Sequence, residues 1–133
     1  MKVTIATRKS PLALAQARWV ARELKRHHKG LEVEELHLVT LGDRIQDRPL
    51  SEVGGKGLFV TEIEEALSDG RADLAVHSMK DVPAELAPGL MLAAVSSREV
   101  PWDALCARAP VTVDALPHGA RVGTSSMRRQ CQL

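Results

Sequence analysis

The fold is decided by the stretch KVTIATRKSPLALAQARWVARELKRHHKG, residues 2–30. Residues 2–7 alternate apolar and polar side chains, which predicts a short β-strand. Ser10 and Pro11 then supply a helix N-cap and a proline suited to the first helical position. From residue 12 to residue 28 apolar side chains recur every three or four positions, so the pattern predicts an amphipathic helix that ends at the following glycine.

The pattern continues as alternating strands and helices. Residues 31–40 predict a second strand, and two strands joined by one helix favour a parallel pair. Residues 58–68 return to helical spacing, and residues 72–76 predict a short, buried strand of a parallel sheet. The sequence therefore predicts an α/β protein with a mainly parallel sheet.

The remaining segments are less regular. Residues 41–57 contain four glycines and a proline with no sustained period, which predicts a functional or mobile loop. The apolar runs at residues 90–95 and 120–123 predict two further strands. A short helix opened by Thr112 and a helix start at residues 125–126 complete the chain.

Composition excludes several classes of protein. The 133 residues carry 18 Lys+Arg and 17 Asp+Glu, so the charge balance argues against nucleic acid as a partner. No apolar run is long enough to span a membrane, and the N-terminus becomes polar too early for a signal peptide. Cys106 and Cys131 give neither a disulfide framework nor a zinc site, and no residue set has metal-ligand spacing. We expect a cytoplasmic protein without a metal.

Arginine outnumbers lysine 12 to 6. Because guanidinium groups bind carboxylates and phosphates in bidentate fashion, this excess favours an anionic ligand. A GC-rich or heat-adapted genome explains the same excess equally well.

Polar side chains follow three of the predicted strands, at the points where an open α/β sheet presents its ligand crevice. Two of these clusters also open helices, whose free N–H groups attract anions. The cluster residues are Arg8, Ser10, Ser78, Lys80, Asp81, Thr124, Ser125, Ser126, Arg128 and Arg129. Together they predict a site for a substrate with several carboxylates or phosphates.

Each cluster also has a simpler interpretation. Ser10 can be only an N-cap, and Lys80 with Asp81 can be an ordinary surface ion pair. Arg128 and Arg129 are neighbours on a helix and point in different directions, so one alone can be the residue that reaches a ligand.

Asp81 is the most informative ionisable group. A carboxylate among cations suits a reaction in which a nitrogen heterocycle becomes transiently cationic, and it could also transfer protons. The glycines of residues 54–57 do not match a phosphate-binding P-loop, and we expect them to let a loop carry Lys56 over the crevice. His77 ends a buried strand and is expected to be structural.

Four motifs carry a resemblance to a known family. They are residues 6–13 (ATRKSPLA), 53–59 (VGGKGLF), 75–83 (AVHSMKDVP) and 122–129 (VGTSSMRR). In this order they cover the chain, and they resemble porphobilinogen deaminase, also called hydroxymethylbilane synthase.

The resemblance implies a transferase of porphyrin and tetrapyrrole biosynthesis. It joins four porphobilinogen molecules head to tail, releases ammonia each time and makes hydroxymethylbilane. A dipyrromethane cofactor, held covalently by a cysteine, would be the primer. Asp81 would contact pyrrole N–H groups and stabilise the cationic azafulvene formed on deamination, and Phe59 would pack against a ring. The residues implied to hold ring carboxylates are Arg8, Ser10, Lys56, Ser78, Lys80, Thr124, Ser125, Ser126, Arg128 and Arg129.

The resemblance also implies a type II periplasmic-binding-protein-like fold with a mixed, mainly parallel sheet. Residues 1–97 would form most of domain 1, residues 98–133 the hinge and the first part of a similar domain 2, and domain 3 would be absent. The cofactor cysteine belongs to that third domain, so the chain alone is expected to be incomplete and inactive. Glu52, Val100 and Trp102 depart from the family pattern, and Glu52 places one anion contact in doubt.

Two other classes remain as alternatives. One is an organic-anion-binding module of the same fold without catalysis, which Asp81 disfavours. The other is a nucleotide-dependent enzyme, which the failed P-loop match disfavours. The expected partner is the small-molecule substrate porphobilinogen, with no nucleic acid and no membrane, and the complete enzyme is expected to be a monomer.

Overall fold

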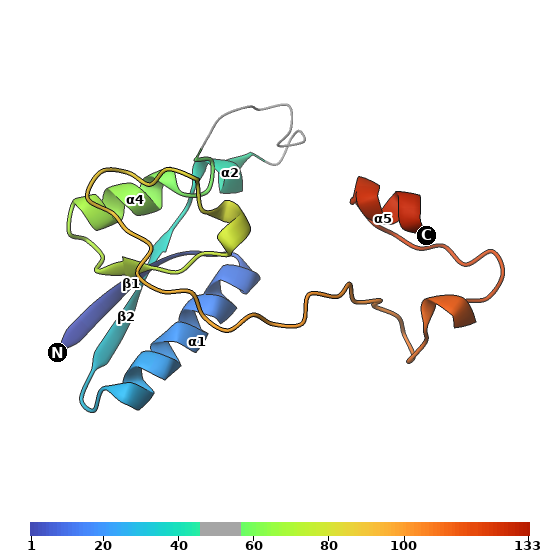
Figure 1. Cartoon of the computed structure of the whole chain (residues 1–133), viewed down its shortest axis with the longest axis horizontal. Coiled ribbons are helices and arrows are strands. Elements are labelled where there is room, and N and C mark those ends of the chain that lie inside the picture. The colour runs from blue at the N-terminus through green and yellow to red at the C-terminus, as the bar shows by residue number, and fades with distance from the viewer. Residues whose placement is uncertain (46–56) are drawn as a thin grey trace. The chain divides into compact units, whose positions relative to one another are not determined.

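The computed structural model describes residues 1–45 and 57–133, and it divides into a first unit, Met1–Ala94, and a second unit, Val95–Leu133 (Figure 1). The first unit contains, in order, β1 (Lys2–Arg8), α1 (Pro11–His27), β2 (Glu32–Leu38), α2 (Leu41–Arg44), α4 (Thr61–Ser68), β3 (Leu74–Ala75) and the 3₁₀ helix η1 (Met79–Asp81). The second unit contains the 3₁₀ helix η2 (Val113–Ala115) and α5 (Met127–Gln132).

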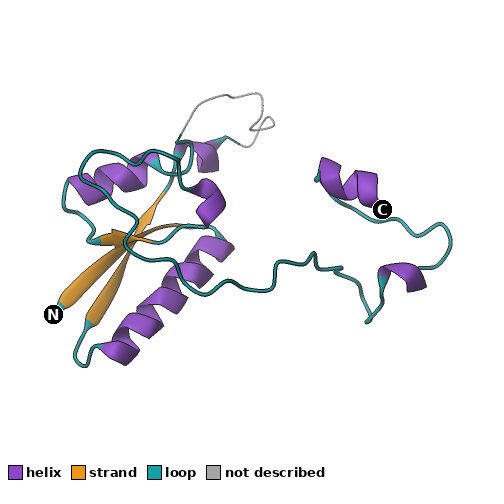
Figure 2. Ribbon diagram, in the orientation of Figure 1, coloured by secondary structure: helices purple, strands orange, loops and turns teal. Residues whose placement is uncertain are grey.

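A small parallel sheet organises the first unit (Figure 2). The strand order is β2-β1-β3, with β1 in the middle and both neighbours parallel to it. Val3 of β1 pairs with Val33 of β2, and Ile5 pairs with Leu74 of β3. The predicted α/β class, the first two strands and their parallel pairing are confirmed.

The first helix begins where its capping residues predict. Ser10 is the N-cap of α1, and its side chain accepts a hydrogen bond from the Ala13 N–H at 3.3 Å. Pro11 is the first helical residue, where its missing N–H costs nothing. Cationic side chains occupy the last turn, and Gly30 then adopts a φ of +77°, which lets the chain turn back toward β2.

Both faces of the sheet are covered. Ile5 and Ala6 are successive residues of β1 and therefore point to opposite faces, yet neither is exposed to solvent. Ala6 packs in a cluster with Ile63 of α4 and with Ala72. Figure 1 shows α1 and α4 on either side of the sheet. The core of the first unit is therefore built around the central strand.

Two elements differ from the sequence-based expectation. The helix predicted from residue 58 begins at Thr61, because residues 57–60 form a turn. Gly57 allows this turn with a φ of +85°, and its carbonyl accepts from Val60 N–H, Thr61 N–H and the Thr61 hydroxyl. The second difference is α2, a single helical turn inside the segment predicted to be a loop.

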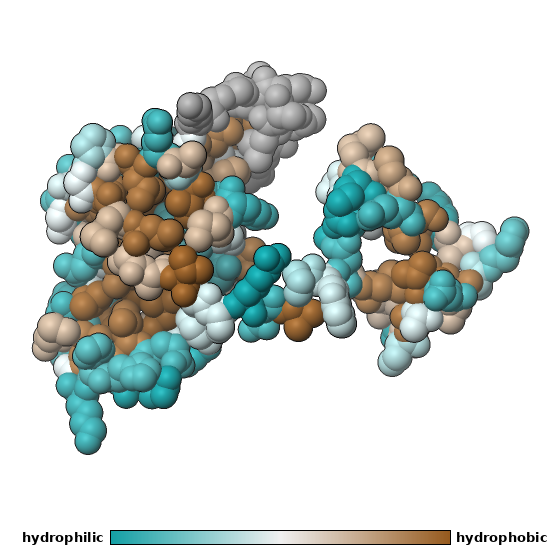
Figure 3. All heavy atoms as spheres, viewed as in Figure 1, coloured by the Kyte–Doolittle hydropathy of each residue, from teal (hydrophilic) through white to brown (hydrophobic). Residues whose placement is uncertain are grey.

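The strands predicted at residues 90–95 and 120–123 are wrong. In the part of the chain that the structure describes, these residues pair with no strand. A strand is stable only when its backbone groups pair with a neighbouring strand, and these two segments have no such partner in the described sheet. Several apolar side chains of these segments, including Met91, Val95 and Val122, are exposed. Apolar side chains are visible among the surface atoms of both units in Figure 3. The short helix expected after Thr112 is present as η2.

Among the described helices, none combines the length and apolar character needed to cross a bilayer.

Ile63→Ala should destabilise the first unit by about 2–5 kcal/mol, because it leaves a cavity between α4 and β1. Ile63 is only 1% exposed and packs against Ala6 and Ala72. Urea unfolding followed by circular dichroism measures the change. Leu12→Ala is the control, because Leu12 lies on α1 with 58% of its surface exposed. Equal unfolding midpoints for the two variants would contradict this packing.

Candidate active site

Two oppositely charged side chains meet at the carboxyl edge of the sheet. Arg8 is the last residue of β1, and Asp81 is the last residue of η1, which follows β3. Arg8 Nη1 lies 3.8 Å from Asp81 Oδ2, and the two side chains are 18% and 22% exposed. They meet because β1 and β3 are parallel neighbours, whose carboxyl ends lie at the same edge. The structure therefore brings two of the predicted site residues together.

The Arg8 guanidinium is held on two further sides. Its Nε and Nη2 lie 3.1 and 2.5 Å from Asp43 Oδ1, and the Phe59 ring centroid lies 4.1 Å from Cζ, a cation–π contact. Gly42 permits this stacking, because a Cβ there would overlap the Phe59 ring. Phe59 thus supports Arg8, and its contact with a pyrrole ring stays a prediction.

Asp43 is the residue of this site that sequence reasoning missed. Its Oδ2 accepts hydrogen bonds from the Thr40 N–H at 3.2 Å and from the Thr40 hydroxyl at 2.8 Å. The hydrogen bond from Arg8 is the main cause that holds the pKa of the Asp43 carboxyl below its ordinary value. A signal was present, since Thr40 and Asp43 have the spacing of a capping box.

His77 is close enough to Arg8 and Asp81 for both charges to affect its pKa. It is partly buried, and that burial is the main cause that lowers its pKa below the ordinary value of 6.5. Arg8 lowers the pKa further, while Asp81 and Glu64 act in the opposite direction. Within residues 1–45 and 57–133, no three His, Cys, Asp or Glu side chains are placed to hold a metal ion.

The other predicted residues of the first unit contribute less charge. The Ser10 hydroxyl caps α1, as its simpler interpretation expects. Ser78 Oγ donates to Gln16 Oε1 at 3.1 Å, which ties the start of η1 to α1. Lys80 is exposed beside Asp81. Lys56 lies outside the residues that the structure describes.

In the second unit, two arginines converge on one carboxylate. Arg128 Nη2 lies 2.8 Å from Asp103 Oδ2, and Arg129 Nη2 lies 2.6 Å from Asp103 Oδ1. Both neighbouring arginines therefore contact the same internal carboxylate, and whether one or both of them reach a ligand stays a prediction. The two hydrogen bonds, that of Arg129 first, lower the pKa of Asp103 to about 2, and Asp103 raises the pKa of Arg129.

Hydroxyl groups organise the start of α5. Ser126 is its N-cap, and its Oγ accepts from the Arg129 N–H at 3.4 Å. Thr124 Oγ1 accepts from the Ser126 N–H at 3.1 Å, and Ser125 is exposed. The predicted cluster of the second unit therefore consists of a helix cap followed by two cations in the first turn of α5.

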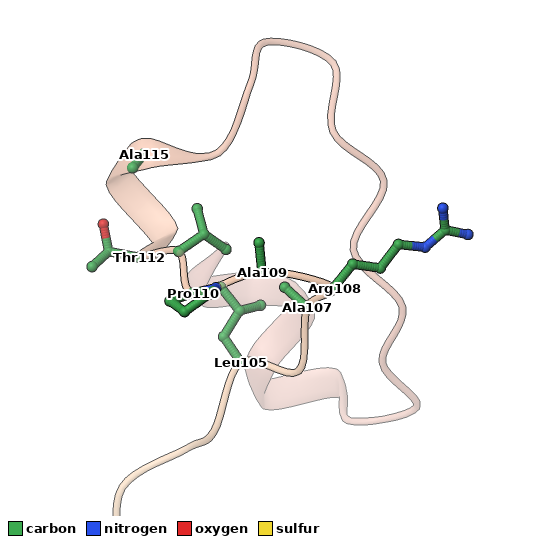
Figure 4. Close-up of a pocket in the computed structure, with 8 residues that line it drawn as sticks. Leu105, Ala107, Arg108, Ala109, Pro110, Thr112 and Ala115 are labelled. Carbon is green, nitrogen blue, oxygen red and sulfur yellow. The ribbon is translucent and has the colours of Figure 1, made fainter.

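A hollow of about 770 Å³ in the second unit is a separate feature (Figure 4). Its wall is mostly apolar, from Leu105 to Ala115, and Arg108 is its single charged side chain. Figure 4 shows Arg108 extending away from the other lining residues. None of the predicted site residues lines this hollow, so the candidate site rests on the charged clusters instead.

The fold and these clusters define a class of protein: an α/β protein with a carboxylate and a guanidinium together at the carboxyl edge of its parallel sheet, where open α/β sheets bind their ligands. Comparison with known proteins makes this more specific. The family model described as "Porphobilinogen deaminase, dipyromethane cofactor binding domain" matches residues 3–133. The chain belongs to the porphobilinogen deaminase family, as its motifs predict.

A curated relative is similar along almost the whole chain. The porphobilinogen deaminase of Sorangium cellulosum (strain So ce56) is 57% identical over 132 residues, which is 99% of this chain. The same match covers 44% of the relative, so the chain spans less than half of that protein's length.

His77→Asn should make the stability of the first unit less dependent on pH. The folded pKa lies below 6.5, so as pH falls through 6.5 the unfolded chain takes up a proton at His77 before the folded chain does. The free energy of unfolding therefore falls on acidification, and we expect a smaller fall in the variant. Urea unfolding at about pH 7.5 and about pH 5.5 measures it. His28→Asn, at the exposed end of α1, should keep the full fall; an unchanged fall in His77→Asn would refute the role of burial.

Arg129→Gln should raise the pKa of Asp103 from about 2 toward its ordinary value of 3.8, because Arg129 is the largest cause of the shift. A titration of the carboxyl-carbon NMR signal of Asp103 measures this change directly. Arg108→Gln, at an exposed position of the same unit, is the matched control and should leave the titration unchanged. Identical curves for Arg129→Gln and the parent chain would rule out the contact.

Proposed function

We propose that the protein carrying this chain is a porphobilinogen deaminase, a transferase of tetrapyrrole biosynthesis. It joins four porphobilinogen molecules into hydroxymethylbilane and releases one ammonia for each. The observation that carries the proposal is the 3.8 Å contact between Arg8 and Asp81 at the carboxyl edge of the sheet. Family membership and the similarity to the Sorangium cellulosum porphobilinogen deaminase support it.

Asp81 has the chemistry that the substrate needs. Loss of ammonia from the aminomethyl carbon removes the electron pair of the C–N bond and leaves positive charge shared with the pyrrole nitrogen. An ionised carboxylate next to that nitrogen accepts a hydrogen bond from its N–H group and stabilises the positive charge as it develops. At 3.8 Å the Arg8 pair is an ion pair beyond hydrogen-bond distance, so Asp81 oxygens stay available to a ligand.

The cations have a separate task, which is to bind the acetate and propionate groups of pyrrole rings. Arg8 and Lys80 in the first unit and Arg128 and Arg129 in the second are the charged donors, and Ser78 adds a hydroxyl group. The contact of both Arg128 and Arg129 with Asp103 supports this role, because it demonstrates that the pair accommodates one carboxylate.

The same residues fit the dipyrromethane cofactor that the family description names. A pair of linked pyrroles with acidic side chains requires cations for the carboxylates and an acceptor for the N–H groups, and Arg8 and Asp81 offer one of each. When bound, the cofactor supplies the pyrrole carbon to which the first substrate is joined. Cys106 and Cys131 are exposed thiols, and the resemblance assigns the attachment to neither.

The wider organisation is also a proposal. The resemblance supports a type II periplasmic-binding-protein-like fold, with residues 1–97 as most of one domain and residues 98–133 as the hinge and the start of a second. It supports a cytoplasmic monomer that acts on a small molecule, without nucleic acid or membrane as a partner.

Asp81→Ala should abolish nearly all turnover, by at least about a hundredfold, and leave the fold intact. The test uses a chimeric enzyme in which this chain replaces the matching segment of the Sorangium cellulosum porphobilinogen deaminase. Hydroxymethylbilane formation is followed by its absorbance after cyclisation and oxidation. Thermal unfolding of the same variant checks the fold.

Asp114→Ala is the matched control, because it removes an exposed carboxylate from η2 and should keep normal turnover. A normal rate for Asp81→Ala would show that the assigned role is wrong. A parent chimera that binds porphobilinogen without making hydroxymethylbilane would favour the alternative, an organic-anion-binding module.

A further inference from the structure

We propose that Asp43 is a positioning residue that fixes the Arg8 guanidinium, so that one defined edge of it faces Asp81 and a ligand carboxylate. The identity of that ligand rests on the proposed function above. The fixing of Arg8 itself does not, since it follows from contacts within the first unit.

The hydrogen-bond donors of Arg8 can be accounted for one by one. A guanidinium has five N–H donors in a rigid plane. Asp43 takes Nε–H and one hydrogen of Nη2, at 3.1 and 2.5 Å. The two hydrogens of Nη1 and the second hydrogen of Nη2 remain; one hydrogen of each nitrogen forms the remaining bidentate edge, and Nη1 is the nitrogen that lies 3.8 Å from Asp81. A ligand carboxylate can therefore make a bidentate pair with Arg8 along one edge only.

Asp43 can impose this orientation because it is fixed itself. Thr40 is fully buried, and both its N–H and its hydroxyl donate to Asp43 Oδ2. The Gly42 N–H donates to the Leu58 carbonyl at 2.7 Å, which joins α2 to the turn that carries Phe59. The carboxylate beside Arg8 and the ring that stacks on it are thus anchored to each other.

Charge balance alone does not explain this arrangement. Asp81 is already a carboxylate beside Arg8, so a second one is not needed to neutralise the cation. The exposed Arg18–Glu35 pair of the same unit is a useful contrast: Arg18 is 55% exposed and its Nε lies 3.1 Å from Glu35. An arginine that is held by two atoms, stacked on a ring and one-fifth exposed has lost its rotational freedom before a ligand arrives, which is the basis of preorganised binding.

The first measurement is made on the 133-residue chain by NMR of the arginine Nε–Hε groups. In the parent chain we expect the Arg8 Hε to be shifted downfield and slow to exchange, and Arg8→Lys identifies its signal. Asp43→Asn should move it toward the position of a solvated arginine, because the variant loses the negative charge that strengthens the bond from Arg8, and its amide nitrogen cannot accept the two hydrogen bonds from Thr40 that hold the side chain in place. Thr40→Val, which removes only the hydroxyl donor, should give a smaller change in the same direction. Glu35→Gln is the matched control and should leave the Arg8 signal unchanged.

The second measurement is steady-state kinetics in the chimeric enzyme. Asp43→Asn should raise KM for porphobilinogen by between about tenfold and a hundredfold, with kcat changed by less than about threefold. Asp81→Ala should instead lower kcat, so the two variants separate positioning from chemistry. Glu35→Gln should leave both constants at their parent values.

The outcomes distinguish the inference from the function on which it rests. An Arg8 signal that is unchanged in Asp43→Asn and Thr40→Val would overturn the positioning of Arg8. A lost signal with an unchanged KM, in an active chimera, would overturn its importance for ligand binding. An inactive parent chimera would count against the proposed function, and the NMR comparison would still decide whether Asp43 fixes Arg8.

Discussion

The Arg8 guanidinium has to be neutralised where it stands, because its side chain is only 18% exposed and a partly buried cation has lost much of its hydration. Three segments that are distant in the sequence surround the guanidinium, two with a carboxylate and one with an aromatic ring. Asp43 comes from α2, Phe59 from the turn before α4, and Asp81 from η1. The edge of the sheet is therefore organised around one cation, and each of these segments is placed partly by its contact with that side chain.

Strand order decides which segments can reach Arg8. β1 is central, so the segments that follow β2 and β3 both leave the sheet beside its carboxyl end. The β1–β3 register pairs Ala6 with Ala75, and the Val76 N–H continues it by donating to the Ala6 carbonyl. Asp81 reaches Arg8 because the single turn of η1 folds the chain back there.

The sequence predicted those parts of this arrangement that depend on local signals. Ser10 and Pro11 mark the start of α1 because a cap acts within one helical turn. The strands predicted at residues 90–95 and 120–123 were wrong. An apolar run indicates that a segment is favoured in a sheet, but it does not show that a neighbouring strand is available for pairing. Asp43 was missed for a related reason: its partner Arg8 is 35 residues away, and only the fold brings the two together. The Thr40 and Asp43 spacing was the one local sign of its position.

The two sets of cations also differ in how readily they can exchange partners. Asp43 is partly buried and fixed by Thr40, so removing it from Arg8 would strand a carboxylate among protein atoms. Asp103 is exposed, so water can solvate its carboxylate when its hydrogen bonds with Arg128 and Arg129 break. A ligand carboxylate can therefore compete with Asp103 at low cost, whereas it has to share Arg8 with Asp43. Under the proposed function, Arg8 is thus suited to hold a ligand in one orientation, and the arginine pair is suited to exchange one carboxylate for another.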